Sequence, residues 1–222
     1  MVINEFERIR GRLGFDEGIH GKEEYFNSVV LVLLVPINGE YHFVFQKRCT
    51  NIRQGGEICF PGGKVEENDE TLEKVAIRET TEEMGIPKEK ILIIGRLNTI
   101  VAPMGATVDA FVSIAEIGIE EICINQREVE SVISIPVSYF INVEPERYSV
   151  QIKIDPSYTD KESGEEIILL PSEQLGLPDL YKKPWGSFKY GVFVYKTDYG
   201  ILWGITSRLI YDFISKIKKL SK

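Results

Sequence analysis

One segment, residues 69–86, constrains the fold most, because the apolar stripe of a helix turns acidic halfway along it. The positions that a packed helix keeps apolar, spaced i, i+3, i+4 and i+7, read Leu72, Val75, Ala76, Glu79, Glu82, Glu83 and Ile86. Burying unpaired carboxylates is costly, so this half of the stripe requires a cationic partner. Carboxylates three and four residues apart can converge on a small divalent ion such as Mg²⁺ or Mn²⁺. The alternative is a solvated acidic helix in which Arg78 is a local ion-pair partner.

The sequence also marks where this helix begins and ends. Asn68 or Asp69 is expected to cap its start. Gly85 is expected to end it in the left-handed conformation, and Pro87 prevents it from continuing.

A glycine-rich segment leads into the acidic helix. Gly55-Gly56 and Gly62-Gly63 flank a short apolar stretch, and the second pair lies just before the helix. With so little side-chain bulk, backbone carbonyls there can ligate a metal ion and a phosphate can approach closely. A glycine pair alone is more often only a tight turn, whereas a glycine loop that leads into an acidic helix face is a much rarer combination.

At these residues the sequence resembles the Nudix hydrolases, whose signature is G-x5-E-x7-R-E-U-x-E-E-x-G-U, where U is apolar. Glu70, followed after seven residues by Arg78–Ile86, fits the second half, with Thr80 at the first U position. The first half departs by one residue, because the expected glycine falls at Lys64 instead of Gly62 or Gly63.

The longer loop resembles the coenzyme A diphosphatase branch of that family. The upstream signature of that branch has its counterpart in Val44–Cys49, followed by Arg53 and the segment Gly56–Gly63, although Gln46 and Cys49 are substitutions. Trp203–Thr206 is similar to the W-G-x-T found near the end of such proteins.

The resemblance implies a metal site and a set of supporting groups. Divalent ions, Mg²⁺ or Mn²⁺, would be held by Glu79, Glu82, Glu83 and a carbonyl near Gly63, and Glu79 is the first choice for the general base. Arg78 would orient the carboxylates. The residues expected around this centre are Arg48, Arg53, Gly62 and Gly63 for substrate binding, Glu70 in support one or two turns earlier, and Glu128 as a further acidic group.

The implied reaction is hydrolysis of the diphosphate of coenzyme A or an acyl derivative, giving 3',5'-ADP and a 4'-phosphopantetheine product. A Nudix hydrolase of ADP-ribose or dinucleotides is the alternative within enzymes. A Nudix-fold domain that senses a nucleotide without cleaving it is the alternative from another class.

The resemblance implies an α/β/α sandwich with a mixed sheet, and we expect a single domain over residues 1–222. Val29–Val35 reads as a buried strand, and Asn38-Gly39 as the turn to its partner strand. Residues 1–26 are expected to form an N-terminal packing arm, residues 145–190 an inserted hairpin and loop, and residues 204–220 an amphipathic C-terminal helix that packs on the core. The insertion has three readings: it covers the site, reaches a partner subunit, or does neither.

Composition limits the partners. The formal net charge of -8 disfavours nonspecific nucleic-acid binding, whereas metal ions can bridge an acidic protein to an anionic diphosphate. The longest apolar run is Val29–Val35, far too short for a bilayer, and we expect no membrane segment or signal peptide. Three cysteines without metal-type spacing indicate reduced thiols in a cytoplasmic protein. A homodimer is expected because many relatives are dimeric.

Overall fold

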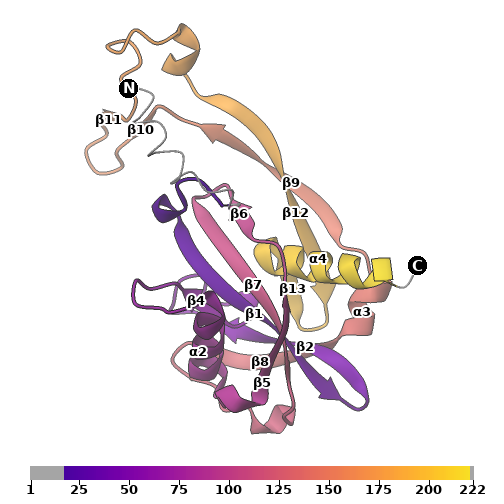
Figure 1. Cartoon of the computed structure of the whole chain (residues 1–222). Helices are drawn as coiled ribbons and strands as arrows, with labels where there is room; N and C mark the ends of the chain where they lie inside the picture. The colour runs from indigo at the N-terminus through magenta and orange to yellow at the C-terminus, as the bar shows by residue number, and fades with distance from the viewer. Residues whose placement is uncertain (1–17, 221–222) are drawn as a thin grey trace, which may run out of the picture.

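The structure is a computed structural model that describes residues 18–220 (Figure 1). Its main element is a mixed eight-stranded sheet, with strands β3-β2-β1-β7-β5 in order, β4 beside β1, β6 beside β7 and β8 beside β2. β1 and β7 run parallel, and the other pairs are antiparallel. Residues 1–17 of the expected N-terminal arm lie outside the described residues.

The strands of this sheet are β1 (Phe26–Ile37), β2 (Glu40–Arg48), β3 (Ile58–Cys59), β4 (Gly62–Lys64), β5 (Ile91–Arg96), β6 (Ile100–Ala102), β7 (Ala106–Ala115) and β8 (Val129–Pro136). The other strands are β9 (Glu146–Ile154), β10 (Ser157–Thr159), β11 (Glu166–Ile168), β12 (Trp185–Thr197) and β13 (Gly200–Trp203). The α-helices are α2 (Leu72–Met84), α3 (Val137–Asn142) and α4 (Gly204–Leu220), and the 3₁₀ helices are η1 (Lys22–Glu24), η2 (Lys88–Lys90), η3 (Ile119–Glu121) and η4 (Asp179–Lys182).

The hairpin that joins β1 to β2 forms where the sequence predicts it. Asn38 and Gly39 both have positive φ angles, 51° and 83°, as a two-residue hairpin turn with the right twist requires. The turn pairs Ile37 with Glu40 and sets the register of both strands.

Helices cover both faces of the sheet, which confirms the predicted α/β/α sandwich. On one face, Val75, Ala76 and Met84 of α2 pack with the buried side chains of β1 and with Phe111 of β7. On the other face, Leu209, Ile210 and Ile214 of α4 pack with Phe43 and Phe45 of β2. The C-terminal helix is therefore a core element, as its apolar stripe predicts.

Helix α2 begins later than the sequence predicts. Its N-cap is Thr71, whose hydroxyl accepts a hydrogen bond from the Lys74 amide at 3.2 Å, so the expectation of Asn68 or Asp69 is wrong. The Asp69 carboxylate instead accepts a hydrogen bond from the Glu66 amide at 2.7 Å and closes the preceding loop. The end of the helix is as predicted, with Gly85 left-handed at φ 66°.

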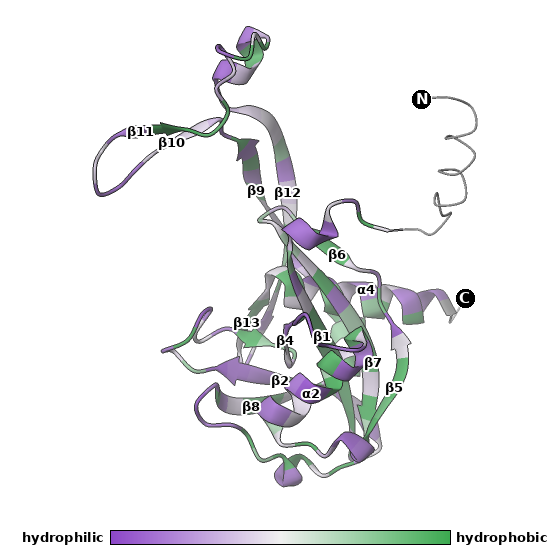
Figure 2. Ribbon diagram, turned by 60° about the vertical axis from the view of Figure 1, so that its left-hand side comes forward, coloured by the Kyte–Doolittle hydropathy of each residue, from purple (hydrophilic) through white to green (hydrophobic). Residues whose placement is uncertain are grey.

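The predicted insertion is confirmed as a long antiparallel ribbon. β9 pairs with β12 from Glu146–Val194 at the base to Ile154–Trp185 at the far end, and β13 pairs with the base of β12. Figures 1 and 2 show this ribbon leaving the body and carrying the β10–β11 hairpin and η4 beyond it. The division of the chain into one domain with an insertion stays a prediction.

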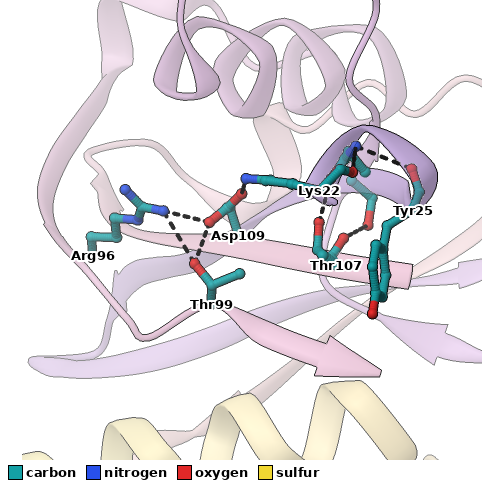
Figure 3. Close-up of polar contacts among 8 residues, drawn as sticks. Lys22, Tyr25, Arg96, Thr99, Thr107 and Asp109 are labelled. Carbon is teal, nitrogen blue, oxygen red and sulfur yellow. Dashed lines mark hydrogen bonds and ion pairs between the residues drawn. The ribbon is translucent and has the colours of Figure 1, made fainter. Parts of the chain in front are cut away.

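A buried carboxylate ties the start of the described chain to the sheet (Figure 3). Asp109 of β7 is 1% exposed, and its carboxylate accepts hydrogen bonds from Lys22, at 2.9 Å, and from Arg96 and Thr99. Burial alone would raise the pKa of Asp109, but these hydrogen bonds outweigh it and hold the pKa below its ordinary value. The network fixes η1 and the β5–β6 connection against β7.

Candidate active site

The glycine pair and the acidic helix meet where the sequence predicts. β4 pairs with β1 so that Gly63 lies opposite Val29, on the face of the sheet that α2 covers. A Cβ atom at Gly63 would lie 2.2 Å from the carboxyl carbon of Glu79. Position 63 is therefore a glycine because the Glu79 carboxyl group occupies the space of a side chain.

Glu83 is the most deeply buried acidic residue of the helix, at 3% exposed. Its carboxylate accepts a hydrogen bond from the Gly62 amide at 2.9 Å and lies 3.6 Å from the Arg48 guanidinium. Burial raises the pKa of Glu83 to about 7, and the nearby Glu79 adds to the shift, although Gln46, Gly62 and Arg48 oppose it. The ionised form of a carboxylate in this position is stabilised by a nearby positive charge.

Glu79 is partly buried, and Arg78 restrains it. The Arg78 guanidinium lies 2.8 Å from one oxygen of Glu79, 3.3 Å from Glu82 and 3.5 Å from Asp69. Burial raises the pKa of Glu79 above its ordinary value, against the effect of Arg78. These contacts give Arg78 the orienting position that the resemblance implies.

Glu82 differs from the other two glutamates of the helix. Its side chain is 58% exposed and contacts Arg78, whereas Glu79 and Glu83 face the glycine loop. The structure thus brings together two of the three predicted ligands with Gly62 and Gly63, and leaves the third at the solvent boundary.

The two predicted substrate-binding arginines have different surroundings. Arg48 ends β2 and lies between Glu83 and the loop, where its Nε donates a hydrogen bond to the Arg53 carbonyl at 3.2 Å. Arg53 is exposed, and its guanidinium lies 5.2 Å from the centre of the Phe26 ring. Arg48 is thus next to the carboxylates, and Arg53 is at the rim.

Two further acidic residues, Glu70 and Glu128, were expected near the centre, and their surroundings in the structure differ. Glu70 lies two residues before α2, is exposed and pairs with Lys74, and its supporting role stays a prediction. Glu128 lies close enough to Glu79 to raise the pKa of that carboxyl group. Its backbone carbonyl also accepts a hydrogen bond from the Cys49 amide at 2.8 Å, which holds it beside the loop after β2.

Sequence reasoning missed a role for Gln46. This side chain is fully buried on β2, and its amide hydrogen-bonds to Glu83 and lies 3.9 Å from the Cys59 sulfur. Its carbonyl oxygen has no partner among the described residues. A polar residue directly after the buried Phe43–Phe45 run is the sequence signal that points to it.

The residues present fit a divalent cation. In residues 18–220, no group of three or more His, Cys, Asp or Glu side chains is close enough together to hold a metal ion as it stands. The donor chemistry is nevertheless suitable, because Glu83 is buried with a raised pKa, Glu79 is beside it, and Gly63 leaves the backbone open. The ligand set Glu79, Glu82, Glu83 and Gly63 stays a prediction.

Comparisons with known proteins agree with this fold. The Nudix domain family matches residues 27–146. The chain is 33% identical over 117 residues to Nudix hydrolase 3 of Caenorhabditis elegans, covering 50% of this chain and 48% of that protein. It is 26% identical over 126 residues to the human mitochondrial coenzyme A diphosphatase NUDT8 (55% and 53% covered), and 31% identical over 114 residues to the mouse peroxisomal coenzyme A diphosphatase NUDT7 (51% and 48%).

The chain spans about half the length of the curated relatives it matches. Among solved structures, a C. elegans Ap4A hydrolase binary complex overlaps with a TM-score of 0.43 at 18% identity, covering 50% of this chain and 80% of that one. Within the described residues, no helix is both long and apolar enough to cross a membrane.

The fold is an α/β/α sandwich in which a glycine pair lies against two carboxylates of one helix. The matching domain covers more than half of the sequence, from β1 to the base of the insertion. The chain belongs to the Nudix family.

Proposed function

We propose that the protein hydrolyses a diphosphate linkage in a reaction that depends on a divalent metal ion. The observation that supports this most is the pairing of Glu79 and Glu83 against the glycine loop, with Arg48 beside them. The two carboxylates are partly neutralised and partly buried, and both have raised pKa values. A metal-binding centre explains this arrangement, whereas a solvated acidic helix does not.

In the proposed mechanism, Glu83, Glu79, Glu82 and a carbonyl near Gly63 hold Mg²⁺ or Mn²⁺. When bound, such an ion neutralises the diphosphate and lowers the pKa of a bound water molecule. Glu79 takes the proton of the attacking water, and burial raises the pKa of this carboxyl group above its ordinary value. Water then adds to one phosphorus, and the bridging oxygen leaves with the other phosphate.

The arginines support this chemistry in two ways. Arg78 holds Glu79 and Glu82 by ion pairs, so it positions the base and one ligand. Arg48 is a guanidinium at the inner edge of the site and is suited to bind a phosphate oxygen of the substrate. Arg53 is proposed to contact the substrate from the rim.

We propose coenzyme A or an acyl derivative as the substrate, cleaved to 3',5'-ADP and a 4'-phosphopantetheine product. The similarity to two named coenzyme A diphosphatases supports this choice. ADP-ribose or a dinucleotide is the alternative, since the glycine loop differs in spacing from the family signature. A non-catalytic nucleotide sensor is the alternative of another class, and the retained Glu79 and Glu83 pairing disfavours it.

The proposed setting is a cytoplasmic homodimer that binds a small nucleotide and neither nucleic acid nor membrane. The free cysteines Cys49, Cys59 and Cys123 are compatible with a reducing compartment.

The test is a product assay by mass spectrometry on coenzyme A, ADP-ribose and NADH, with Mg²⁺ and with Mn²⁺. Release of 4'-phosphopantetheine and 3',5'-ADP that Glu83→Gln abolishes is the expected result. Preferential cleavage of ADP-ribose or NADH would retain the mechanism and replace the substrate. Tight binding of a nucleotide without metal-dependent product would favour the sensor.

A further inference from the structure

The ribbon of the insertion has one face that is apolar on both strands and one that is mainly polar, on which Phe193 lies near the body. Cross-strand pairing places Tyr148 opposite Val192, Val150 opposite Tyr190 and Ile152 opposite Phe188, so these six side chains share one face, here called the apolar ribbon face. The alternate residues of β9, which include Arg147, Ser149 and Lys153, point to the other face.

The apolar ribbon face is open to solvent over most of its length. Tyr148, Val150 and Phe188 are 55%, 49% and 51% exposed. Arg208 of α4 lies over the Tyr190 ring, in the central pair of the face, at 4.9 Å and covers part of that ring. Towards the far end, Figures 1 and 2 show no element of the body beside the ribbon.

The rest of the insertion exposes apolar side chains in the same way. Ile168, Leu169 and Leu180 are 62%, 64% and 64% exposed, and the two buried residues of the insertion beyond the ribbon are Pro156 and Ser172. A two-stranded ribbon without a packed face is marginally stable by itself. Monomers rarely expose a contiguous apolar surface of this size without a partner.

We propose that the apolar ribbon face binds the same face of a second copy of this chain, so that the insertion is the homodimer interface. An antiparallel face-to-face arrangement of two ribbons has twofold symmetry and forms a two-layer sandwich about 10 Å thick. The far part of each insertion then covers apolar side chains of the other copy. The body of each copy, with its Nudix site, stays outside the interface.

Area supports a second copy as the occupant. Eleven large apolar side chains of the insertion are exposed by 37–64%, and three of them, Tyr148, Val150 and Phe188, are on the apolar ribbon face. With about 100 Å² for half of an aromatic side chain and about 50 Å² for half of an aliphatic one, the whole insertion offers about 700 Å² per copy. An interface of standard size needs about 600–1,000 Å² per partner, so the contact requires the far part of the insertion as well as the ribbon face.

Charge supports the same occupant. The six residues of the apolar ribbon face include no charged side chain, although the whole chain has a net charge of -8. Contact between two copies through Tyr148, Val150 and Phe188, the exposed residues of the face, therefore juxtaposes no like charges from the face itself, and the neighbouring cation is Arg208 over the Tyr190 ring. A partner selected by charge complementarity would instead require charged groups on the face.

The test is the mass of the full chain in solution, measured by sedimentation equilibrium from about 1 to 100 µM. The expected result is a dimer of the 25.3 kDa chain that Val150→Asp converts to a monomer, because the charge falls at the centre of the face. The matched control is Ser149→Asp, one residue away on the polar face, which is expected to stay dimeric. Phe188→Asp on β12 repeats the test on the other strand.

Two readouts separate a lost interface from a lost fold. The melting temperature and circular dichroism of each variant, at a concentration where wild type is monomeric, are expected to match wild type. A wild-type monomer at 100 µM would overturn the proposal, as would a folded Val150→Asp variant that remains dimeric. If the wild type is a monomer and deletion of residues 1–17 allows a hydrophobic dye to bind the face, the chain's own N-terminal segment is its occupant. This result would also overturn the proposal. None of these outcomes depends on the proposed hydrolysis.

Discussion

The body and the insertion differ in how far they bury apolar side chains of the same kinds. In the body, Val29, Leu31 and Phe43 are fully buried, and even Asp109 and Glu83 are enclosed with partners. In the insertion, comparable apolar side chains such as Ile168 and Leu169 remain more than 60% exposed. The body has packed cores of its own, although Leu92 and Met104 there are also more than 60% exposed, whereas residues 145–190 contribute no side chain to either core.

The difference also separates two kinds of function. A site that holds charges close together requires the rigid packing of the body, since α2 and β4 fix Glu79 against Gly63. A surface that recognises a partner requires exposure, which the insertion provides. Substitutions in the body should thus affect catalysis and stability strongly, and those in the insertion should affect association.

The largest effect is expected for Glu83→Gln in the body. Removing the charge of this buried carboxylate, a proposed metal ligand, should lower metal-dependent kcat about a thousandfold. The matched substitution in the insertion is Glu173→Gln, whose wild-type side chain is 84% exposed, and it should leave kcat within about twofold. Steady-state kinetics on the best substrate compares the two variants. A similar loss of kcat in both would contradict the division of function between body and insertion.

A smaller loss is expected for Gly63→Ala. The new Cβ would meet the Glu79 carboxyl group at 2.2 Å and displace it, so kcat should fall about a hundredfold. Gly95→Ala is the matched control within the same sheet, because a Cβ at that position would have no atom within 4 Å. If Gly63→Ala retains full activity with an unchanged melting temperature, Glu79 is not fixed by the glycine loop.

The next effect concerns stability and its dependence on pH. Asp109→Asn leaves Lys22 and Arg96 without their buried carboxylate, and should lower the free energy of unfolding by about 3 kcal/mol at pH 7. Because the pKa of Asp109 is lowered by folding, the unfolded chain binds more protons near pH 4. The contribution of Asp109 is then complete above its ordinary pKa of 3.8 and is lost as the pH falls through its lower folded value.

Denaturant titrations of wild type and Asp109→Asn from pH 3 to pH 7 measure this contribution. The gap between the two proteins should close as the pH falls below about 4. Asp160→Asn in the insertion is the control, since the pKa of Asp160 is also lowered, by hydrogen bonds from Ser163 and Glu162, but at an exposed turn. A gap at Asp109 that is constant with pH would mean that its charge does not contribute.

The parts of this molecule that the sequence predicts are those that local patterns determine. The β1–β2 hairpin follows from Asn38-Gly39, and the end of α2 follows from Gly85 and Pro87. The family resemblance predicts that Glu79 and a carbonyl near Gly63 lie around one metal ion, and the structure brings these two residues together, although the glycine departs from the signature spacing by one residue. These features depend on residues close together in the chain or on a known motif.

What the sequence did not predict depends on contacts between distant residues. The Asp109 network joins η1, β5, β7 and the segment before β6, and no periodicity indicates that Lys22 meets a residue 87 positions later. The predicted start of α2 was wrong because Asp69 and Thr71 are both good N-cap residues. The hydrogen bond from the Glu66 amide to the Asp69 carboxylate decides between them. Gln46 was missed because its partner, Glu83, is on another element.

The smallest effect is expected in the insertion itself. Leu169→Ala removes apolar atoms that are already 64% exposed, so the free energy of unfolding of the monomer should change by less than about 0.5 kcal/mol. Leu209→Ala removes the same atoms from a side chain that is 1% exposed between α4 and the sheet, and should cost about 2–5 kcal/mol.

Denaturant unfolding at concentrations low enough to keep both variants monomeric makes the comparison. At higher concentration Leu169→Ala should become more costly if the proposed dimer covers Leu169, whereas the cost of Leu209→Ala should not change. A cost above about 2 kcal/mol for Leu169→Ala in the monomer would mean that the insertion packs within its own chain, which would remove the reason for a second copy.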